Sequence, residues 1–139
     1  MPLRIKLPAK EKVIINGAVI ENAGDATTII LHNKVDILRR KEVMSEEDAV
    51  TPSRRVYYAL QCAYLFKNER KKYLVSFQEF LNDYVAAAPS SADMAGKVVD
   101  LVDQERYYEA LRKTLKLVEH ETERLIEVGA IPAPEAEAG

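Results

Sequence analysis

The residues with the clearest chemical potential in this sequence are basic side chains in its N-terminal third. Five of them are candidates for contacts to an anion: Arg4, Lys6, Arg39, Arg40 and Lys41. The first two alternate with aliphatic residues in "LRIKL", and the other three follow the apolar run of "KVDILRRKEVM". Lysine binds a phosphate as a point charge, whereas arginine grips a phosphate or a guanine edge with two hydrogen bonds. The pattern therefore suits a nucleic-acid partner.

Charge is unevenly distributed along the chain. Residues 1–44 hold eight Lys or Arg against five Asp or Glu, a local charge of +3, although the net charge of all 139 residues is −2. Such asymmetry indicates an anionic partner for the N-terminal part. The alternative is that the cations keep edge strands soluble and prevent edge-to-edge pairing. Both interpretations stay open from the sequence.

The sequence gives little support for catalysis. Its two histidines, His32 and His120, are far apart, and no zinc-ligand, nucleophile-elbow or phosphate-loop motif is present. Cys62 lies in an apolar helical stretch, where a small core residue is expected. The acids near 119–127 lack a histidine at ligand spacing. We therefore predict that the protein is not an enzyme and has no catalytic residue, no metal site and no cofactor.

Short strands are predicted for the N-terminal part. Apolar residues alternate over 3–7, and Asn16-Gly17 between two β-branched runs is typical of a type I′ hairpin. Further strands are expected over 27–32 and 35–38. About five strands with tight turns predict an antiparallel meander or small barrel. If the first and last strands are neighbours, their cations gather into one patch: Arg4, Lys6, Arg39 and Lys41.

Helices are predicted for the rest of the chain. Thr51 followed by Pro52 is a strong helix start for a helix near 52–66. Three- and four-residue apolar spacing predicts a second helix over 70–87. A last helical region over 91–128 has an expected break near 104. The fold class is therefore α+β, an antiparallel β part followed by a bundle of about three to four helices.

Some helical residues are candidates for contacts to a partner. A heptad-like pattern with spacings of 4, 3, 4 and 3 suits packing along a helix of the same chain or of a partner, and it consists of Leu111, Leu115, Val118, Thr122 and Leu125. Tyr58 and Tyr108 each belong to a tyrosine pair, and one ring of each pair could face a partner or line the protein's own core. The basic run "KNERKKY" (67–73) is either a solvated turn or a second site.

Three regions are expected in the chain: a β subdomain over 1–44, a helical subdomain over 45–131 and a flexible tail over 132–139. Residues 1–56 contain no aromatic residue, which disfavours stacking of RNA bases on the sheet. No apolar run approaches the roughly 20 residues of a membrane span. The single cysteine and the lack of a secretory signal predict a cytoplasmic protein with no membrane partner.

The N-terminal segments resemble one family closely. The strings "MPLRIKLP", "INGAVIENAG", "ILRRKEVM" and "TPSRRVYYALQ" occur with the order and spacing of the flagellum biosynthesis repressor FlbT family, over residues 1 to about 66. The resemblance implies a post-transcriptional regulator that acts at the 5′ untranslated region of flagellin mRNA and represses translation or promotes decay. Some members of that family are activators.

The β part is also distantly similar to the carbon storage regulator CsrA, a small RNA-binding protein of five strands. In that likeness the RNA-contacting positions fall on Arg4, Lys6 and Arg39, and we interpret Arg39 as the most buried and directional contact. Leu38 replaces a histidine of CsrA, and Arg40 with Lys41 replaces two acids. The helical part is absent from CsrA.

Two functions follow from these observations. The first is an mRNA-binding regulator whose β part holds flagellin mRNA and whose helices provide homo-oligomerisation or docking. The alternative is an adaptor or chaperone-like factor whose helices bind flagellin or another flagellar regulatory protein. If the isolated fragment 45–139 captures a partner protein and the full chain does not bind RNA, the adaptor function is favoured.

Overall fold

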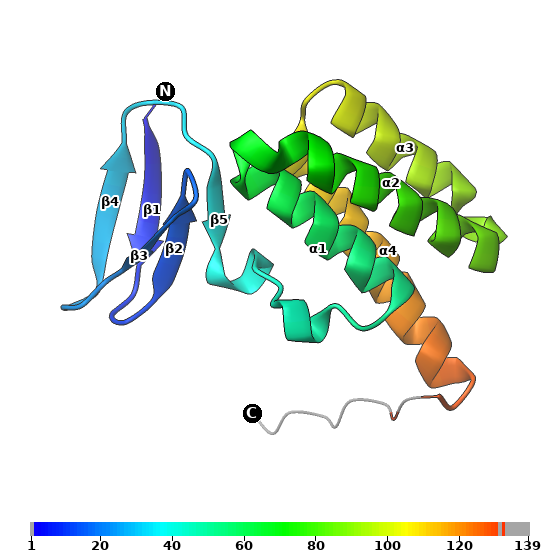
Figure 1. The fold of residues 1–139 in the computed structure, drawn as a ribbon. Coiled ribbons are helices and arrows are strands. Elements are labelled where there is room, and N and C mark those ends of the chain that lie inside the picture. Colours follow the sequence, from blue (N-terminus) through cyan, green and yellow to red (C-terminus); the bar gives the residue numbers. More distant parts are fainter. Residues whose placement is uncertain (1, 131, 133–139) are drawn as a thin grey trace.

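The computed structural model describes residues 2–130 and 132, and it confirms the α+β class. Five strands come first: β1 (Leu3–Leu7), β2 (Lys12–Ile15), β3 (Ala18–Glu21), β4 (Thr27–Leu31) and β5 (Ile37–Arg39). Four α-helices follow: α1 (Pro52–Leu65), α2 (Arg70–Ala87), α3 (Ala92–Asp103) and α4 (Tyr107–Glu127). The strands form one end of the molecule and the helices the other, with β5 between them (Figure 1). Residues 133–139 of the predicted tail lie outside the described residues.

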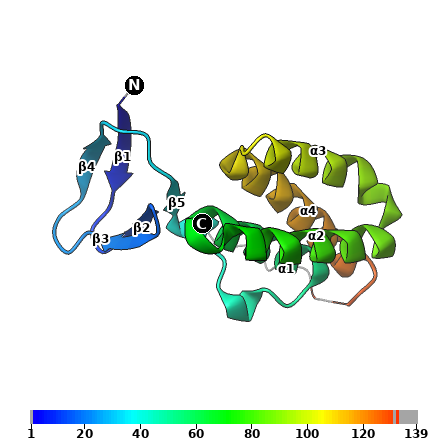
Figure 2. The ribbon, with the colours of Figure 1, turned by 45° about the horizontal axis from the view of Figure 1, so that its top comes forward.

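The strands form two open antiparallel sheets. β1 pairs with β4, and the second sheet has the order β3-β2-β5. The described residues form no closed barrel, so of the two predicted arrangements the barrel is not realised. The first and last strands are not neighbours, because β5 pairs with β2 and not with β1. Figure 2 shows the β1–β4 pair standing apart from the helices.

The predicted hairpin joins β2 to β3. Asn16 and Gly17 have φ of 50° and 83°, the left-handed conformations that a type I′ turn requires. The Asn16 N–H donates to the Asp36 carbonyl at 2.8 Å, and the Asp36 N–H donates to Asn16 Oδ1 at 2.9 Å. These two bonds extend the β2–β5 pairing beyond Ile37. The hairpin tip is thereby held beside the loop that precedes β5.

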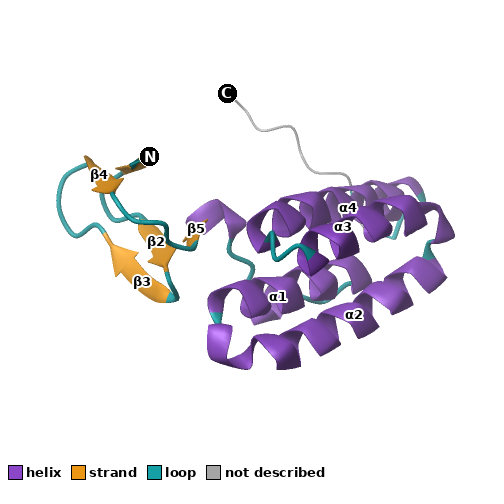
Figure 3. Cartoon of the chain, turned by 90° about the horizontal axis from the view of Figure 1, so that it is seen from above, coloured by secondary structure: helices purple, strands orange, loops and turns teal. Residues whose placement is uncertain are grey.

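Local signals place the helices as predicted. Thr51 Oγ1 accepts from the Arg54 N–H at 3.4 Å, and Pro52 occupies the first turn of α1. α2 has the bounds predicted for it. The last helical region breaks where Glu105 adopts a φ of 60°, between α3 and α4. Figure 3 shows the four helices lying against one another in a single bundle.

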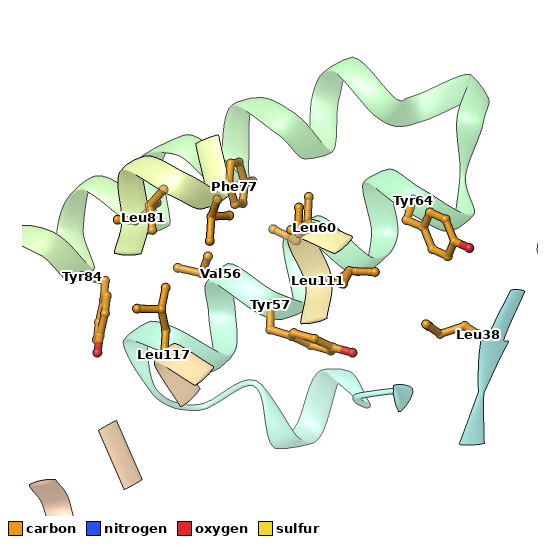
Figure 4. Packing of buried hydrophobic residues seen from close by; sticks show 14 residues of the cluster. Leu38, Val56, Tyr57, Leu60, Tyr64, Phe77, Leu81, Tyr84, Leu111 and Leu117 are labelled. Atoms are coloured by element: carbon orange, nitrogen blue, oxygen red, sulfur yellow. The ribbon is translucent and has the colours of Figure 1, made fainter. Parts of the chain in front are cut away.

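One hydrophobic core fills the bundle and reaches the strands. α1 lies at its centre, with Val56, Leu60 and Tyr57 completely or almost completely buried. Leu38 of β5 belongs to the same cluster and is 0% exposed. Figure 4 shows Leu38 facing Leu111 of α4, with the hydroxyls of Tyr57 and Tyr64 pointing toward the same side. The core therefore fixes β5, and with it Arg39, against the bundle.

Candidate nucleic-acid interface

Glu42 holds the end of β5 in place. It closes the 3-10 turn η1 (Arg40–Glu42), directly after the strand. Its carboxylate accepts from the backbone N–H of Arg39 at 3.1 Å through Oε1, and from the hydroxyl of Tyr108 through Oε2. Its backbone carbonyl accepts from the hydroxyl of Tyr57. One acidic residue therefore links β5 to both α1 and α4.

Side chains of α1 secure the rest of this segment. The hydroxyl of Tyr64 donates to the Ile37 carbonyl at 3.0 Å. The amide of Gln61 bonds the backbone of Met44 in both directions, at 2.7 and 2.9 Å. Each bond satisfies a backbone group that would otherwise be partly buried without a partner. The segment from Ile37 to Met44 is therefore positioned by tertiary contacts, since only three of its residues are in a strand.

Burial and charge explain the titration of the two tyrosines beside this segment. Burial raises the pKa of Tyr64 to about 12, and the carboxylate of Asp36 adds to the effect. The pKa of Tyr108 is also raised, by partial burial first and then by Glu42. The guanidinium groups of Arg112 and Arg39 act on Tyr108 in the opposite direction. Geometry agrees, because the Arg39 N–H and the Tyr108 hydroxyl bond to the same Glu42 carboxylate, and Arg112 follows Tyr108 by one helical turn.

Arg112 is a site residue that the sequence did not single out. It lies on α4, one helical turn after Tyr108, and its side chain is exposed. Arg39 comes from β5, 69 positions before Tyr108 in the chain, and its backbone N–H shares the Glu42 carboxylate with that tyrosine. The sequence places Arg112 four residues after Tyr108, which predicts that the two share a helix face. It does not predict that β5 lies beside that face. Arg39 and Arg112 are thus exposed cations on the strand and the helix that Glu42 and Tyr108 join, and we call this pair the cationic surface.

Arg4 and Lys6 belong to a different surface. They lie on the exposed face of β1, opposite Ile30 and Thr28 of β4, while Ile5 between them is buried. Since β1 and β5 are in separate sheets, the single patch expected from neighbouring first and last strands is wrong. Pairing of β1 with β4 explains this, because it leaves β5 to pair with β2.

The other three predicted cations, Arg39, Arg40 and Lys41, lie at the end of β5 and in η1. Arg39 is exposed, so the interpretation that it is the most buried contact is wrong. The reason is alternation along β5: Leu38 faces the core and is 0% exposed, so Arg39, the next residue, faces solvent. Lys41 lies in η1 and is exposed as well. Arg40 lies in the same turn, and its side chain is outside what the structure describes.

The predicted partner residues mostly serve the protein's own fold. Leu111 is 1% exposed in the core, so no partner can reach it in this fold, and Leu115 packs against the same core. The ring of Tyr108 lies 6.1 Å from that of Tyr64, in addition to its bond with Glu42. Tyr58 is half-buried beside Cys62, and burial raises its pKa to about 12. Tyr108 is 36% exposed and Tyr58 is half-buried, so both rings stay accessible to a partner, and their predicted partner role stays a prediction.

The described part of the chain offers no arrangement for metal or thiol chemistry. No group of three His, Cys, Asp or Glu within it is placed to hold a metal ion. Cys62 is buried, and this burial raises the pKa of its thiol, which keeps the unreactive protonated form. Among the described helices, none combines the length and the hydrophobicity that a membrane-spanning helix requires.

Comparison with known proteins gives one consistent family. The family described as "Flagellar protein FlbT" matches residues 3–125. The flagellum biosynthesis repressor protein FlbT of Caulobacter vibrioides is 30% identical over the full length of both chains. Probable flagellum biosynthesis repressor proteins FlbT of Rhodopseudomonas palustris and of a Chelativorans species are 31% and 34% identical, over 90% and 88% of this chain and 98% and 85% of theirs. No solved structure gives a significant match. The predicted resemblance is confirmed: this chain belongs to the FlbT family.

Proposed function

We propose that this protein represses flagellum biosynthesis after transcription, by binding the 5′ untranslated region of flagellin mRNA and reducing its translation or lifetime. Its relatives are named flagellum biosynthesis repressors, which supports the regulatory part of the proposal. Binding of RNA is supported by the cationic surface at the junction of β5 and α4. RNA carries one negative charge per phosphate, and exposed guanidinium groups bind phosphates with paired hydrogen bonds.

The observation that carries this proposal is the placement of Arg39 and Arg112 around Tyr108. The two arginines come from distant parts of the sequence, and their common neighbour Tyr108 is anchored to Glu42. Neither arginine has an acidic side-chain partner among the ion pairs of the described residues. Their charges are thus available to a phosphate backbone. Lys41 in the adjoining turn adds a third exposed cation.

Arg4 and Lys6 provide a second contact in this proposal. Their strand β1 is paired with β4 alone, so their exposed face is bordered by Thr28 and Ile30. An extended RNA strand that crosses from β5 to β1 would meet cations at both ends. Contacts of this kind position RNA without reading its sequence, because phosphates are the same in every nucleotide.

The test compares single charge removals in the full-length protein. Arg39→Ala and Arg112→Ala should each weaken binding to a flagellin 5′ untranslated transcript by about 1–3 kcal/mol, and each should flatten the salt dependence. The matched control is Lys97→Ala, which removes one exposed cation from α3 and should change neither property. Fluorescence anisotropy at several salt concentrations measures both. Equal affinities for all three variants and the native chain would refute the proposal.

A groove between α2 and α3 favours a second candidate function, that of an adaptor that binds flagellin. The groove has a volume of about 410 Å³, and apolar side chains of Leu81, Val85 and Val99 line it. An amphipathic helix of a partner could place its apolar face there. Val99→Asp should abolish capture of purified flagellin by the full chain if the adaptor function is right, and should leave RNA affinity unchanged.

A further inference from the structure

A groove lies where the β2–β3 hairpin meets the turn between α1 and α2. Its volume is about 700 Å³, within the usual range for small-molecule sites. The hairpin approaches the helix so closely that a Cβ at Gly17 would lie 3.2 Å from the carbonyl oxygen of Leu65. The hairpin position is fixed in addition by the bonds between Asn16 and Asp36. The strands and the helices therefore shape this groove together.

Two aromatic rings line one side of the groove. Phe66 and Tyr73 have ring centroids 6.1 Å apart and planes inclined by 39°. The backbone N–H of Phe66 donates to the Cys62 carbonyl at 2.9 Å, at the end of α1, so the residue is well positioned. Its side chain is nevertheless 47% exposed. An exposed, positioned ring offers a flat face on which a nucleobase can stack.

Cations surround the same turn. Residues 67–73 contain four Lys or Arg and one acid. Arg70 has a structural role, since its guanidinium donates to the Ala63 carbonyl at 2.8 Å and lies 4.4 Å from the centroid of Tyr107. Lys71 and Lys72 are exposed, and Lys72 Nζ lies 5.4 Å from the centroid of Tyr73. The ammonium group of Lys72 therefore lies beside an aromatic ring of the groove, where a phosphate of a stacked nucleotide would lie, and Lys71 adds an exposed cation next to it in the sequence.

Polar groups complete the lining. Glu69, Asn16 and Asn68 line the groove together with the rings, and the side-chain oxygen of Asn16 is occupied by the Asp36 N–H. A carboxylate repels phosphate but accepts hydrogen bonds from the amino groups of cytosine and guanine. An acid inside a cationic rim therefore favours a base in the groove and phosphates outside it. Recognition of single-stranded RNA commonly combines stacking on aromatics with hydrogen bonds to base edges.

We propose that this groove binds one unstacked base of a single-stranded RNA, with the base on Phe66, its edge toward Glu69, and the flanking phosphates on Lys71 and Lys72. The proposal rests on the proposed RNA-binding function and adds a base-reading site to a surface that contacts phosphates. The aromatic face lies outside the strands, so it is compatible with the lack of aromatics in residues 1–56.

The experiment uses the absence of tryptophan from this chain. Phe66→Trp in the full-length protein retains an aromatic face and introduces a single indole. Short oligocytidylate should quench its fluorescence, whereas an abasic ribose-phosphate oligomer of the same length should not. Val128→Trp, at an exposed position after α4, is the matched control and should not be quenched by either. Phe66→Ala should weaken oligocytidylate binding about 5- to 150-fold, and Phe66→Leu should do the same without removing the apolar contact.

Each other outcome overturns the proposal in a recognisable way. If Phe66→Trp is not quenched while oligocytidylate still shifts the protein in a native gel, the groove is not the base site, but RNA binding stands. If neither oligocytidylate nor a flagellin 5′ untranslated transcript binds at all, the proposed function fails as well. Equal quenching by the abasic oligomer would mean a phosphate site. Quenching by purified flagellin alone would mean a protein-binding site.

Discussion

The hydroxyl of Tyr108 donates a hydrogen bond to the carboxylate of Glu42, 66 positions earlier in the chain. Glu42 closes the turn after β5, and Tyr108 lies in the first turn of α4. The same carboxylate also accepts from the N–H of Arg39. The bond therefore joins the two elements that carry Arg39 and Arg112, and it fixes the spacing of the proposed phosphate contacts.

Removal of this bond should have a measurable cost in stability. Tyr108→Phe deletes one hydrogen bond at a partly exposed site, so we expect a loss of about 1 kcal/mol in the free energy of unfolding. Glu42→Ala deletes two bonds and should cost about 1–3 kcal/mol. Urea titrations of both single variants and of the double variant give the coupling energy. A coupling of roughly 1 kcal/mol is expected, and full additivity would show that the two side chains do not interact.

The two cationic surfaces should contribute independently to RNA binding. Arg4 and Lys6 lie on β1, in a different sheet from β5, so their loss should not change the contacts of Arg39 and Arg112. One double variant replaces Arg4 and Lys6 with alanine, and the other replaces Arg39 and Arg112. The loss of binding free energy in the quadruple variant should equal the sum of the losses in these two within about 0.5 kcal/mol. Anisotropy titrations with one transcript measure each affinity. A cost well above or below that sum would mean that the four cations act as one patch.

Buried Glu121 should stabilise the start of α1. Its Oε2 accepts from the backbone N–H of Ser53 at 3.0 Å, across 68 residues. Glu121→Ala leaves that buried N–H without a partner and should lower the free energy of unfolding by about 1–3 kcal/mol. Glu121→Gln keeps an acceptor oxygen and should recover part of the loss. Glu123→Ala is the control, since this side chain is exposed on the same helix, and it should change stability little. Equal losses for both alanine variants would contradict the capping role.

Stability should fall at high pH because of the buried tyrosines. The folded protein raises the pKa of Tyr64 from 10.0 to about 12, so the folded state holds this proton more tightly than the unfolded state. The contribution of protonated Tyr64 to the free energy of unfolding is complete below pH 10. It is lost as the pH rises from 10 toward 12, by an amount on the order of 2 kcal/mol. Tyr64→Phe should show a smaller loss over this interval in urea titrations. An unchanged pH profile in that variant would exclude Tyr64 as the cause.

Local features of the fold were predictable because their causes are local. Asn16-Gly17 adopts left-handed dihedrals in any chain that turns there, and Thr51 with Pro52 starts a helix without help from distant residues. The bounds of α2 follow from apolar spacing within its own sequence. Alternation in β1 likewise identified Arg4 and Lys6 as exposed, since neighbouring strand residues face opposite sides. The family followed from the same local strings.

Strand order and the neighbours of Arg39 were decided by the tertiary structure. Alternation tells which face of a strand is buried, but it does not tell which strand lies beside it, and β5 therefore paired with β2 against expectation. Leu38 packs in the helical core. Arg39, the next residue, is therefore held beside α4 with its side chain exposed. The structure adds Arg112 to the candidate site and removes Leu111, which is buried in the core. Neither result could be predicted locally, because both depend on contacts between residues about 70 positions apart. The sequence by itself thus determined the helices, the strands and the cations that they carry. The contacts of Leu38 and Glu42 with the bundle determined that β5, with Arg39, lies beside α4, with Arg112.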